Sequence, residues 1–129
     1  EICAGVTNWI YNMYVECVNA DATTLNRLYN RAYCLVYPSI YEGFGLPIVE
    51  AQKAGCPVIA YGVSSIPEVM GDSRLMIKSN VSSTEIMSKI NLLKNQSLRK
   101  EEIELARENA KRFTLKKLQC EYIELYRSI

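Results

Sequence analysis

The chain has 129 residues, 49% of them hydrophobic and 22% charged, a balance that is typical of one soluble globular domain and excludes an intrinsically disordered chain. Its 15 basic and 14 acidic residues give a formal net charge of +1, so the composition predicts no nucleic-acid partner. Histidine is absent, which excludes a Ser-His-Asp triad, a Cys-His pair and a histidine-based metal site built from this chain alone.

The first predicted elements alternate between strand and helix. Met13–Val18 is a run that suits a short strand. Asp21 is a suitable N-cap for a helix in which apolar residues recur at helical spacing from Leu25 to Ala32. Tyr33–Tyr37 is a continuous apolar run of strand length, and a proline ends it. We therefore expect a strand–helix–strand unit before the first glycine-containing loop.

Beyond that loop the chain repeats the alternation. The predicted elements are a helix from Pro47 to Ala54 with Gly55 at its C′ position, a strand over Pro57–Tyr61, a short helical turn over Ser64–Met70 and a short strand over Leu75–Ile77. Apolar strands without polar alternation are typical of a parallel sheet that is covered on both faces. The order of elements predicts an α/β fold with an open, Rossmann-like parallel sheet and right-handed crossovers.

From residue 82 onward the chain is predicted to be wholly helical. Ser82 opens a capping box for the first of these helices, Ser97 is a suitable cap for the second and Thr114 for the third. The charged run over residues 99–112 is interpreted as a solvated helix face with ion pairs inside the helix. We expect one partial domain over 1–129, with a sheet region over 1–81 and a helical region over 82–129.

Cysteine usage and the length of apolar runs bear on the location of the protein. The five cysteines include no CxxC pair, and Cys34 and Cys56 lie in apolar runs, so we expect reduced thiols, no zinc site and a cytoplasmic protein. No apolar run approaches the roughly 20 residues that a membrane span needs. No signal peptide is visible, and the chain begins with Glu1 rather than Met. We therefore expect a processed chain or an excised piece of a longer protein.

The stretch Pro38–Glu50 is the part of the sequence that predicts a ligand site. It joins the end of a strand to the first turns of a helix, and open parallel sheets bind ligands beyond the carboxyl ends of their strands. The glycines allow a ligand close to the backbone, and the helix N-terminus attracts phosphate. Glu50 is placed to accept hydrogen bonds from ribose hydroxyls, and Glu42 to face neutral sugar hydroxyls. From spacing alone, an equally good interpretation is a dipole-favoured first-turn acid at Glu50 and a surface loop residue at Glu42.

The sequence YEGFGLPIVEA contains Glu42 and Glu50 with seven residues between them, and it resembles the E-x7-E motif of family-four retaining glycosyltransferases. Residues 25–39 resemble the helix and strand before the motif, and residues 54–75 resemble the strand and Pro-Glu-Val loop after it. Within that second segment, Ser73 and Arg74 depart from the small apolar residues usual in the family. The resemblance implies the GT-B fold, in which two Rossmann-like domains enclose the active site. This chain is similar to part of the C-terminal, sugar-nucleotide-binding domain.

The resemblance also implies roles for individual residues. Glu50 would bind the ribose of the donor, and Glu42 would contact the transferred sugar as the catalytic residue. Backbone amides in the loop would meet the sugar hydroxyls and the diphosphate; they belong to Gly43, Phe44, Gly45 and Leu46. No metal and no cofactor is implied, because the helix N-terminus and basic side chains offset the charge of the leaving group. The family's basic diphosphate clamp lies in an earlier segment that has no match in this chain.

These inferences predict a fragment of a hexosyltransferase-type enzyme that transfers a sugar from a nucleotide-sugar donor with retention, in polysaccharide or glycolipid synthesis. The expected partners are the donor and an N-terminal acceptor domain, without which the isolated chain is expected to be inactive. Peripheral membrane association of the full-length enzyme and self-association of the fragment are compatible with this interpretation. Two other functions stay open: a non-catalytic nucleotide-sugar-binding module, and a GT-B relative such as a sugar-nucleotide epimerase or a phosphorylase.

Overall fold

The computed structural model describes residues 18–78 and 83–129. The elements within these residues are α1 Ala22–Arg31, β1 Leu35–Tyr37, α2 Leu46–Ala54, β2 Val58–Tyr61, α3 Ile66–Met70, β3 Met76–Ile77, α4 Ser83–Leu92, α5 Gln96–Ala110 and α6 Leu115–Arg127. Apart from Val18, the predicted strand at Met13–Val18 lies outside the described residues, as does the predicted capping residue Ser82. The alternation of helices and strands follows the order that the sequence predicts.

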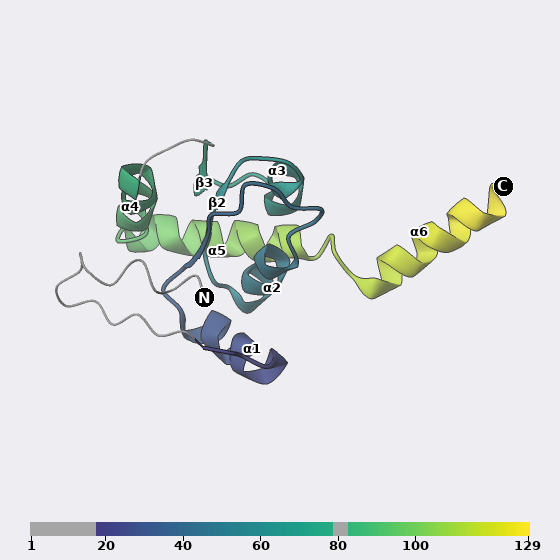
Figure 1. The fold of residues 1–129 in the computed structure, drawn as a ribbon, viewed down its shortest axis with the longest axis horizontal. Helices are drawn as coiled ribbons and strands as arrows, with labels where there is room; N and C mark the ends of the chain where they lie inside the picture. Colours follow the sequence, from purple (N-terminus) through teal and green to yellow (C-terminus); the bar gives the residue numbers. More distant parts are fainter. Residues whose placement is uncertain (1–17, 79–82) are drawn as a thin grey trace.

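The three strands form one parallel sheet in the order β1-β2-β3 (Figure 1). Leu35 is paired with Val58 at the start of β1, and Ala60 is paired with both Tyr37 and Met76. The central strand β2 is buried over its first three residues. Since the strands are parallel and the sheet does not close, the predicted α/β class with an open parallel sheet is confirmed.

The strands are shorter than the apolar runs that predict them. Tyr33 and Cys34 precede β1, although their run continues into it. Pro57 lies just before β2, because a proline has no amide hydrogen to donate to a neighbouring strand. Its carbonyl still accepts a hydrogen bond from the amide of Leu35 at 2.8 Å, so backbone pairing reaches one residue beyond the assigned strand.

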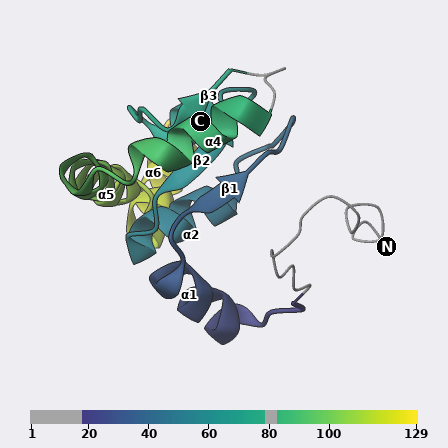
Figure 2. The same cartoon turned by 90° about the vertical axis from the view of Figure 1, so that its left-hand side faces the viewer.

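Helix α2 lies between α1 and α5, in contact with both, and α5 runs along the body of the fold (Figures 1 and 2). The core between the sheet and its helices includes three isoleucines with no exposed surface: Ile48, Ile59 and Ile66. Gln52 is also buried, and its side-chain nitrogen donates to the carbonyl of Met70 at 3.0 Å. Asn109 of α5 in turn donates to the side-chain oxygen of Gln52 at 2.9 Å. The core therefore contains a hydrogen-bonded link between α2, the end of α3, and α5.

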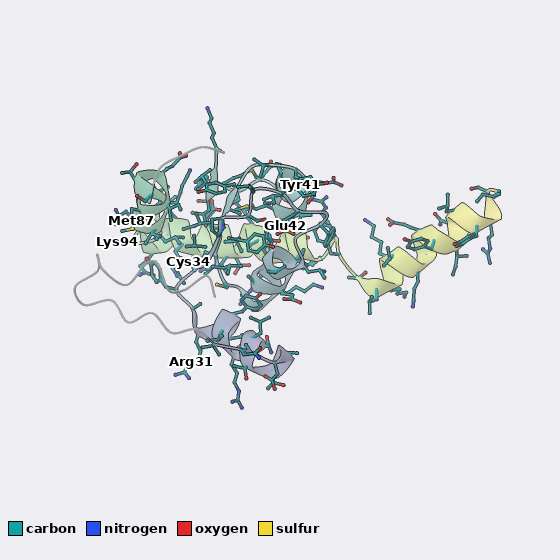
Figure 3. The ribbon with its side chains drawn as sticks, viewed as in Figure 1. Arg31, Cys34, Tyr41, Glu42, Met87 and Lys94 are labelled. Atoms are coloured by element: carbon teal, nitrogen blue, oxygen red, sulfur yellow. The ribbon has the colours of Figure 1, made fainter. Side chains whose placement is uncertain are left out.

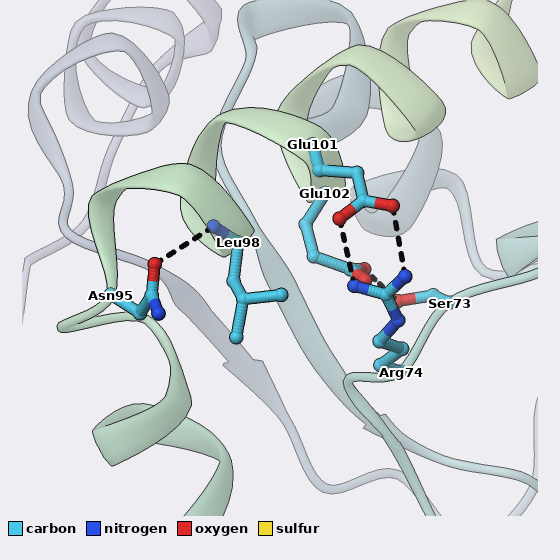
Figure 4. Close-up of polar contacts among 6 residues, drawn as sticks. All are labelled: Ser73, Arg74, Asn95, Leu98, Glu101 and Glu102. Atoms are coloured by element: carbon cyan, nitrogen blue, oxygen red, sulfur yellow. Dashed lines mark hydrogen bonds and ion pairs between the residues drawn. The ribbon is translucent and has the colours of Figure 1, made fainter.

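Helix α5 is more than the solvated charged face that the sequence predicts. Arg74 forms two hydrogen bonds with Glu101, at 2.8 and 2.9 Å, and Ser73 donates to Glu102 at 2.8 Å (Figure 4). Glu102 is only 4% exposed. Ser73 and Arg74, which depart from the pattern of the family that the sequence resembles, thus attach the loop before β3 to α5. The ion pair between Lys111 and Glu108 is of the intrahelical kind that the sequence predicts.

Helix α6 projects away from the rest of the described fold (Figure 1). None of its residues is buried. Its large apolar side chains are exposed over most of its length; they include Leu115, Leu118, Tyr122, Ile123, Leu125 and Tyr126. None of the helices in residues 18–78 and 83–129 has the length and apolar character that a bilayer-spanning helix requires.

The helix starts test the predicted caps directly. Asp21 accepts a hydrogen bond from the amide of Thr24 at 2.8 Å, and Thr114 accepts one from the amide of Lys117 at 3.2 Å, so both predicted caps are confirmed. The predicted cap Ser97 is wrong. Asn95 caps α5, and its side-chain oxygen accepts from the amides of Ser97 and Leu98 at 3.0 and 3.2 Å (Figure 4). Asparagine caps a helix as well as serine does, and here it comes two residues earlier.

Replacing Asn95 with alanine should lower the free energy of unfolding by about 1 kcal/mol, because two first-turn amides lose their acceptor. Urea unfolding followed by circular dichroism measures this change. Ser97→Ala is the matched control and should alter stability by less than about 0.5 kcal/mol, since its exposed side chain caps nothing. A larger loss in Ser97→Ala than in Asn95→Ala would contradict the assignment.

Candidate functional site

The predicted site residues lie on the loop between β1 and α2 and on the first turns of α2. This loop leaves the carboxyl end of β1, beside the loop that leaves the carboxyl end of β2. Figure 3 shows Tyr41 and Glu42 close together on this loop. The predicted residues from Glu42 to Leu46 therefore follow the edge where open parallel sheets bind their ligands, and Glu50 lies in the middle of α2.

Glu42 is held at its carboxylate by Tyr37, the last residue of β1. The Tyr37 hydroxyl donates to Oε1 of Glu42 at 2.5 Å. This bond and a second from the Ser39 hydroxyl hold the pKa of Glu42 below its usual value, because both stabilise the ionised carboxylate. The same contact is the main cause that raises the pKa of Tyr37 to about 12, so the phenol keeps its proton and acts as a donor.

The backbone of Glu42 is held from the loop after β2. The Ser64 and Ser65 hydroxyls both donate to the carbonyl of Glu42, at 2.8 and 2.9 Å. Ser65 also lies 3.3 Å from the carbonyl of Phe44. Ser64 has a φ of 53°, a left-handed conformation that is uncommon outside glycine. The loop after β2 thus fixes the loop that carries Glu42.

The structure requires glycine at only one of the two glycine positions in this loop. Gly45 is buried at the N-cap of α2 with a φ of 90°, and a Cβ there would lie 3.3 Å from Cδ1 of Ile48. Both its backbone conformation and its packing favour glycine. A Cβ on Gly43 would meet no atom within 4 Å. The packing of the described chain does not require glycine at position 43, and the space beside its backbone is open.

The start of α2 has no side-chain cap. Gly45 has no side chain to accept from the first-turn amides, and Pro47 follows within the first two positions of the helix. Leu46, the first residue of α2, is 62% exposed. Phe44 is half exposed, and its ring packs edge-on against Phe113, with centroids 5.4 Å apart. The helix therefore begins without a side-chain cap; Ile48 donates its amide to the carbonyl of Gly45 at 3.0 Å, so an anion would meet the amides that precede Pro47.

Glu50 lies one turn into α2 and lines a pocket of about 450 Å³ between α1 and α2. The other lining residues are Ala22, Leu25, Asn26, Tyr29, Asn30, Lys53 and Ala54. The buried Tyr29 donates its hydroxyl to Oε2 of Glu50 at 3.4 Å. Burial and the neighbouring Glu50 carboxylate both raise the pKa of Tyr29. The second glutamate is thus exposed beside an open pocket and in contact with one phenol.

The structure places Glu42 on the loop at the carboxyl end of β1 and Glu50 in the pocket between α1 and α2, and it adds residues that sequence reasoning missed. Tyr29 and Tyr37 contact the glutamates, and Ser64 and Ser65 hold the loop. One signal was available, because a buried or half-buried tyrosine usually needs a partner for its hydroxyl. Among the described residues, no group of three or more cysteine, aspartate or glutamate side chains is arranged to hold a metal ion.

Comparison with known protein families gives a match over most of the chain. Residues 17–113 match the family described as glycosyl transferases group 1. This range includes every element from α1 to α5 and both glutamates of the candidate site. No solved structure gives a significant match to the chain.

Three relatives illustrate the similarity. O-antigen chain mannosyltransferase B of Escherichia coli is 55% identical over 53 residues, which cover 41% of this chain and 14% of the relative. O-antigen chain mannosyltransferase RfbU of Salmonella typhimurium is 45% identical over 53 residues, covering 41% and 15%. MMP alpha-(1->4)-mannosyltransferase of Mycolicibacterium hassiacum is 53% identical over 34 residues, covering 26% and 8%. The matches span only a small part of each relative.

Proposed function

This chain belongs to the glycosyl transferases group 1 family, and we propose that it forms the donor-binding part of an enzyme that transfers a mannosyl residue from a nucleotide sugar during polysaccharide or glycolipid synthesis. The proposed sugar and pathway come from the similarity to O-antigen mannosyltransferases of Escherichia coli and Salmonella typhimurium. Because those matches cover a small part of each relative, the activity of the whole protein belongs to the proposal.

The observation that carries the proposal is the placement of Glu42 and Glu50 on either side of an uncapped helix start. In the proposed complex, the diphosphate lies at the N-terminus of α2 and meets the backbone of residues 43–46. The helix dipole contributes about 0.3–1 kcal/mol to such an anion, and up to about 2 kcal/mol when the site is partly buried. The open space beside Gly43 supports this placement, because a ligand can approach the backbone there.

The two glutamates have different proposed roles. Glu50 accepts hydrogen bonds from the ribose hydroxyls of the donor, which suits an exposed carboxylate beside the pocket between α1 and α2. Glu42 accepts hydrogen bonds from the hydroxyls of the transferred sugar. Its lowered pKa supports this role, because the carboxylate stays ionised as an acceptor. No metal or cofactor enters the proposal.

The proposed reaction proceeds with retention at the anomeric carbon. The bond between that carbon and the phosphate oxygen breaks, and its electron pair stays on the departing diphosphate. The sugar gains oxocarbenium character while an acceptor hydroxyl adds to the same face and gives its proton to the departing diphosphate oxygen. Catalysis is then mainly electrostatic, since the backbone amides at the start of α2 stabilise charge that grows in the transition state.

Titration of the full-length protein with nucleotide sugars tests the proposal. A suitable panel is GDP-mannose, UDP-glucose, UDP-galactose and UDP-N-acetylglucosamine, with calorimetry for binding and radiolabelled donors plus a lipid-linked acceptor pool for transfer. We expect binding and transfer with GDP-mannose. Binding without transfer would favour a non-catalytic module, and failure to bind any member of the panel would refute the proposal.

Glu50→Ala should weaken binding of the preferred donor by about 1.5–3 kcal/mol, the range for hydrogen bonds to a charged group. Calorimetric titration of the variant with the same donor measures the loss. Glu104→Ala is a matched control, because it removes an exposed glutamate from α5, away from the loop after β1. Parent affinity in Glu50→Ala would remove Glu50 from the ribose site.

A further inference from the structure

Each of the two glutamates receives a hydrogen bond from a tyrosine that belongs to the scaffold. Tyr37 ends β1 and donates to Glu42, and Tyr29 lies on the inner side of α1 and donates to Glu50. The first contact is short, at 2.5 Å, and the second is at the outer limit of a hydrogen bond, at 3.4 Å. The contact at Glu42 therefore imposes the stronger constraint.

Glu42 is fixed at both ends of the residue. Ser64 and Ser65 hold its backbone carbonyl from the loop after β2, and Tyr37 holds its carboxylate from β1. A glutamate on an exposed loop otherwise has several rotamers, each of which carries the carboxylate to a different place. These contacts, from the end of β1 and from the loop after β2, reduce that freedom before any ligand arrives.

The contact leaves the carboxylate able to bind a sugar. An ionised carboxylate has about four acceptor positions, of which Tyr37 and Ser39 occupy two. In this contact the phenol donates its proton and the carboxylate accepts. The remaining acceptor positions of the carboxylate are left for sugar hydroxyls. The raised pKa of the phenol, about 12, keeps the proton on Tyr37 throughout the pH range in which a protein is assayed.

We propose that Tyr37 is a positioning residue, which orients the carboxylate of Glu42 toward the transferred sugar through its 2.5 Å hydrogen bond from the end of β1. This inference rests on the proposed function, since it deepens the role of Glu42 in sugar transfer. It assigns Tyr37 no contact with substrate. Tyr29 has the corresponding place beside Glu50, so its removal acts on the ribose side of the site.

Tyr37→Phe in the full-length transferase tests the inference, with GDP-mannose or whichever panel donor is turned over fastest. We expect kcat to fall about ten-fold, because the carboxylate is less well placed, while the donor KM changes less than about two-fold. Tyr29→Phe should do the opposite, raising the donor KM and changing kcat little. Tyr33→Phe is the matched control; its ring stacks under Arg99, and loss of its hydroxyl should leave both constants at parent values.

The pH profile separates positioning from a merely structural role. Tyr37 is the titratable group that faces the Glu42 carboxylate from another element, with Ser39 as its second hydroxyl donor. Since the Tyr37 bond lowers the pKa of Glu42, its loss raises that pKa, and the ionised fraction of Glu42 falls at higher pH than in the parent. The acid limb of kcat should therefore move to higher pH in Tyr37→Phe and stay in place in Tyr33→Phe.

The outcomes are distinct for the inference and for the function on which it rests. Parent kcat and a parent acid limb in Tyr37→Phe would overturn the inference if Glu42→Gln loses activity under the same conditions. Parent kcat in Glu42→Gln would instead refute the proposed role of Glu42 itself. In a third outcome, Tyr37→Phe lowers both the midpoint temperature of thermal unfolding and kcat, while the acid limb of kcat stays in place. That result would show that Tyr37 supports the fold alone and would also overturn the inference.

Discussion

Glu42→Gln in the proposed full-length transferase is expected to lower kcat by about a hundred-fold and to change nucleotide affinity far less. Glutamine keeps the size of the side chain, but it loses the charge and one acceptor oxygen. The single amide oxygen offers about two acceptor positions in place of about four, so contact with Tyr37 leaves at most one for a sugar hydroxyl. A small misplacement of the reacting sugar is enough for a loss of this order. Steady-state kinetics with a radiolabelled donor and calorimetric titration with the free nucleotide measure the two effects separately.

The control for this variant is Glu104→Gln, which makes the same chemical change on an exposed face of α5. It should keep the parent kcat. If Glu42→Gln lost nucleotide affinity in proportion to kcat, Glu42 would act in ground-state binding and its proposed place at the transferred sugar would be wrong.

Ile48→Ala should lower the free energy of unfolding by about 2–5 kcal/mol. Ile48 has no exposed surface and packs in the core from the first turn of α2. The loss combines the transfer free energy of the removed carbons with the cavity that they leave. Urea unfolding of the chain, followed by circular dichroism, measures the change. Since Cδ1 of Ile48 also lies beneath Gly45, the variant should loosen the start of α2 as well.

Leu46→Ala, two residues earlier in the same helix, is the control for Ile48→Ala. Its side chain is 62% exposed, so its removal should change stability by less than about 0.5 kcal/mol. Equal losses in the two variants would mean that the inward and outward faces of this helix start are wrongly assigned.

The elements that the sequence predicts well are those with a local chemical cause. Asp21 and Thr114 cap the helices that follow them, since capping depends on a few adjacent residues. Gly55 ends α2 with a φ of 76°, a conformation that glycine adopts at little cost. The buried strand β2 follows from a continuous apolar run. Local steric preference and hydrophobic burial were therefore sufficient for the order and type of the elements.

Features that depend on contacts between distant residues could not be predicted in this way. Nothing near Glu102 in the sequence indicates that Ser73 binds it, and Arg99 lies over the ring of Tyr33, far away along the chain. The helical period shows which residues share a face, but it does not show which charged residues of that face find partners across the fold. A solvated face is therefore too simple a description of the charged run over residues 99–112.

The candidate site also has features that depend on adjacent residues and features that depend on contacts between distant ones. The position of Glu42 and Glu50 around a helix start follows from the sequence, because loop and helix are contiguous there. The contacts of Tyr37, Ser64 and Ser65 depend on how the ends of β1 and β2 lie side by side in the sheet. Serine hydroxyls are common in loops, so their presence before α3 does not predict which carbonyl they bind.

The separation of α6 from the body has a consequence for local unfolding. A helix of 13 residues with no buried side chain has little support beyond its own backbone hydrogen bonds, its Thr114 cap and weak side-chain pairs. An isolated helix of that length is marginal in water. Helix α5, by contrast, shares buried hydrogen bonds with α2 and packs on the core. We therefore expect the two consecutive helices to belong to different cooperative units, with amide hydrogens of α6 exchanging with solvent through fraying that leaves the sheet and α5 intact.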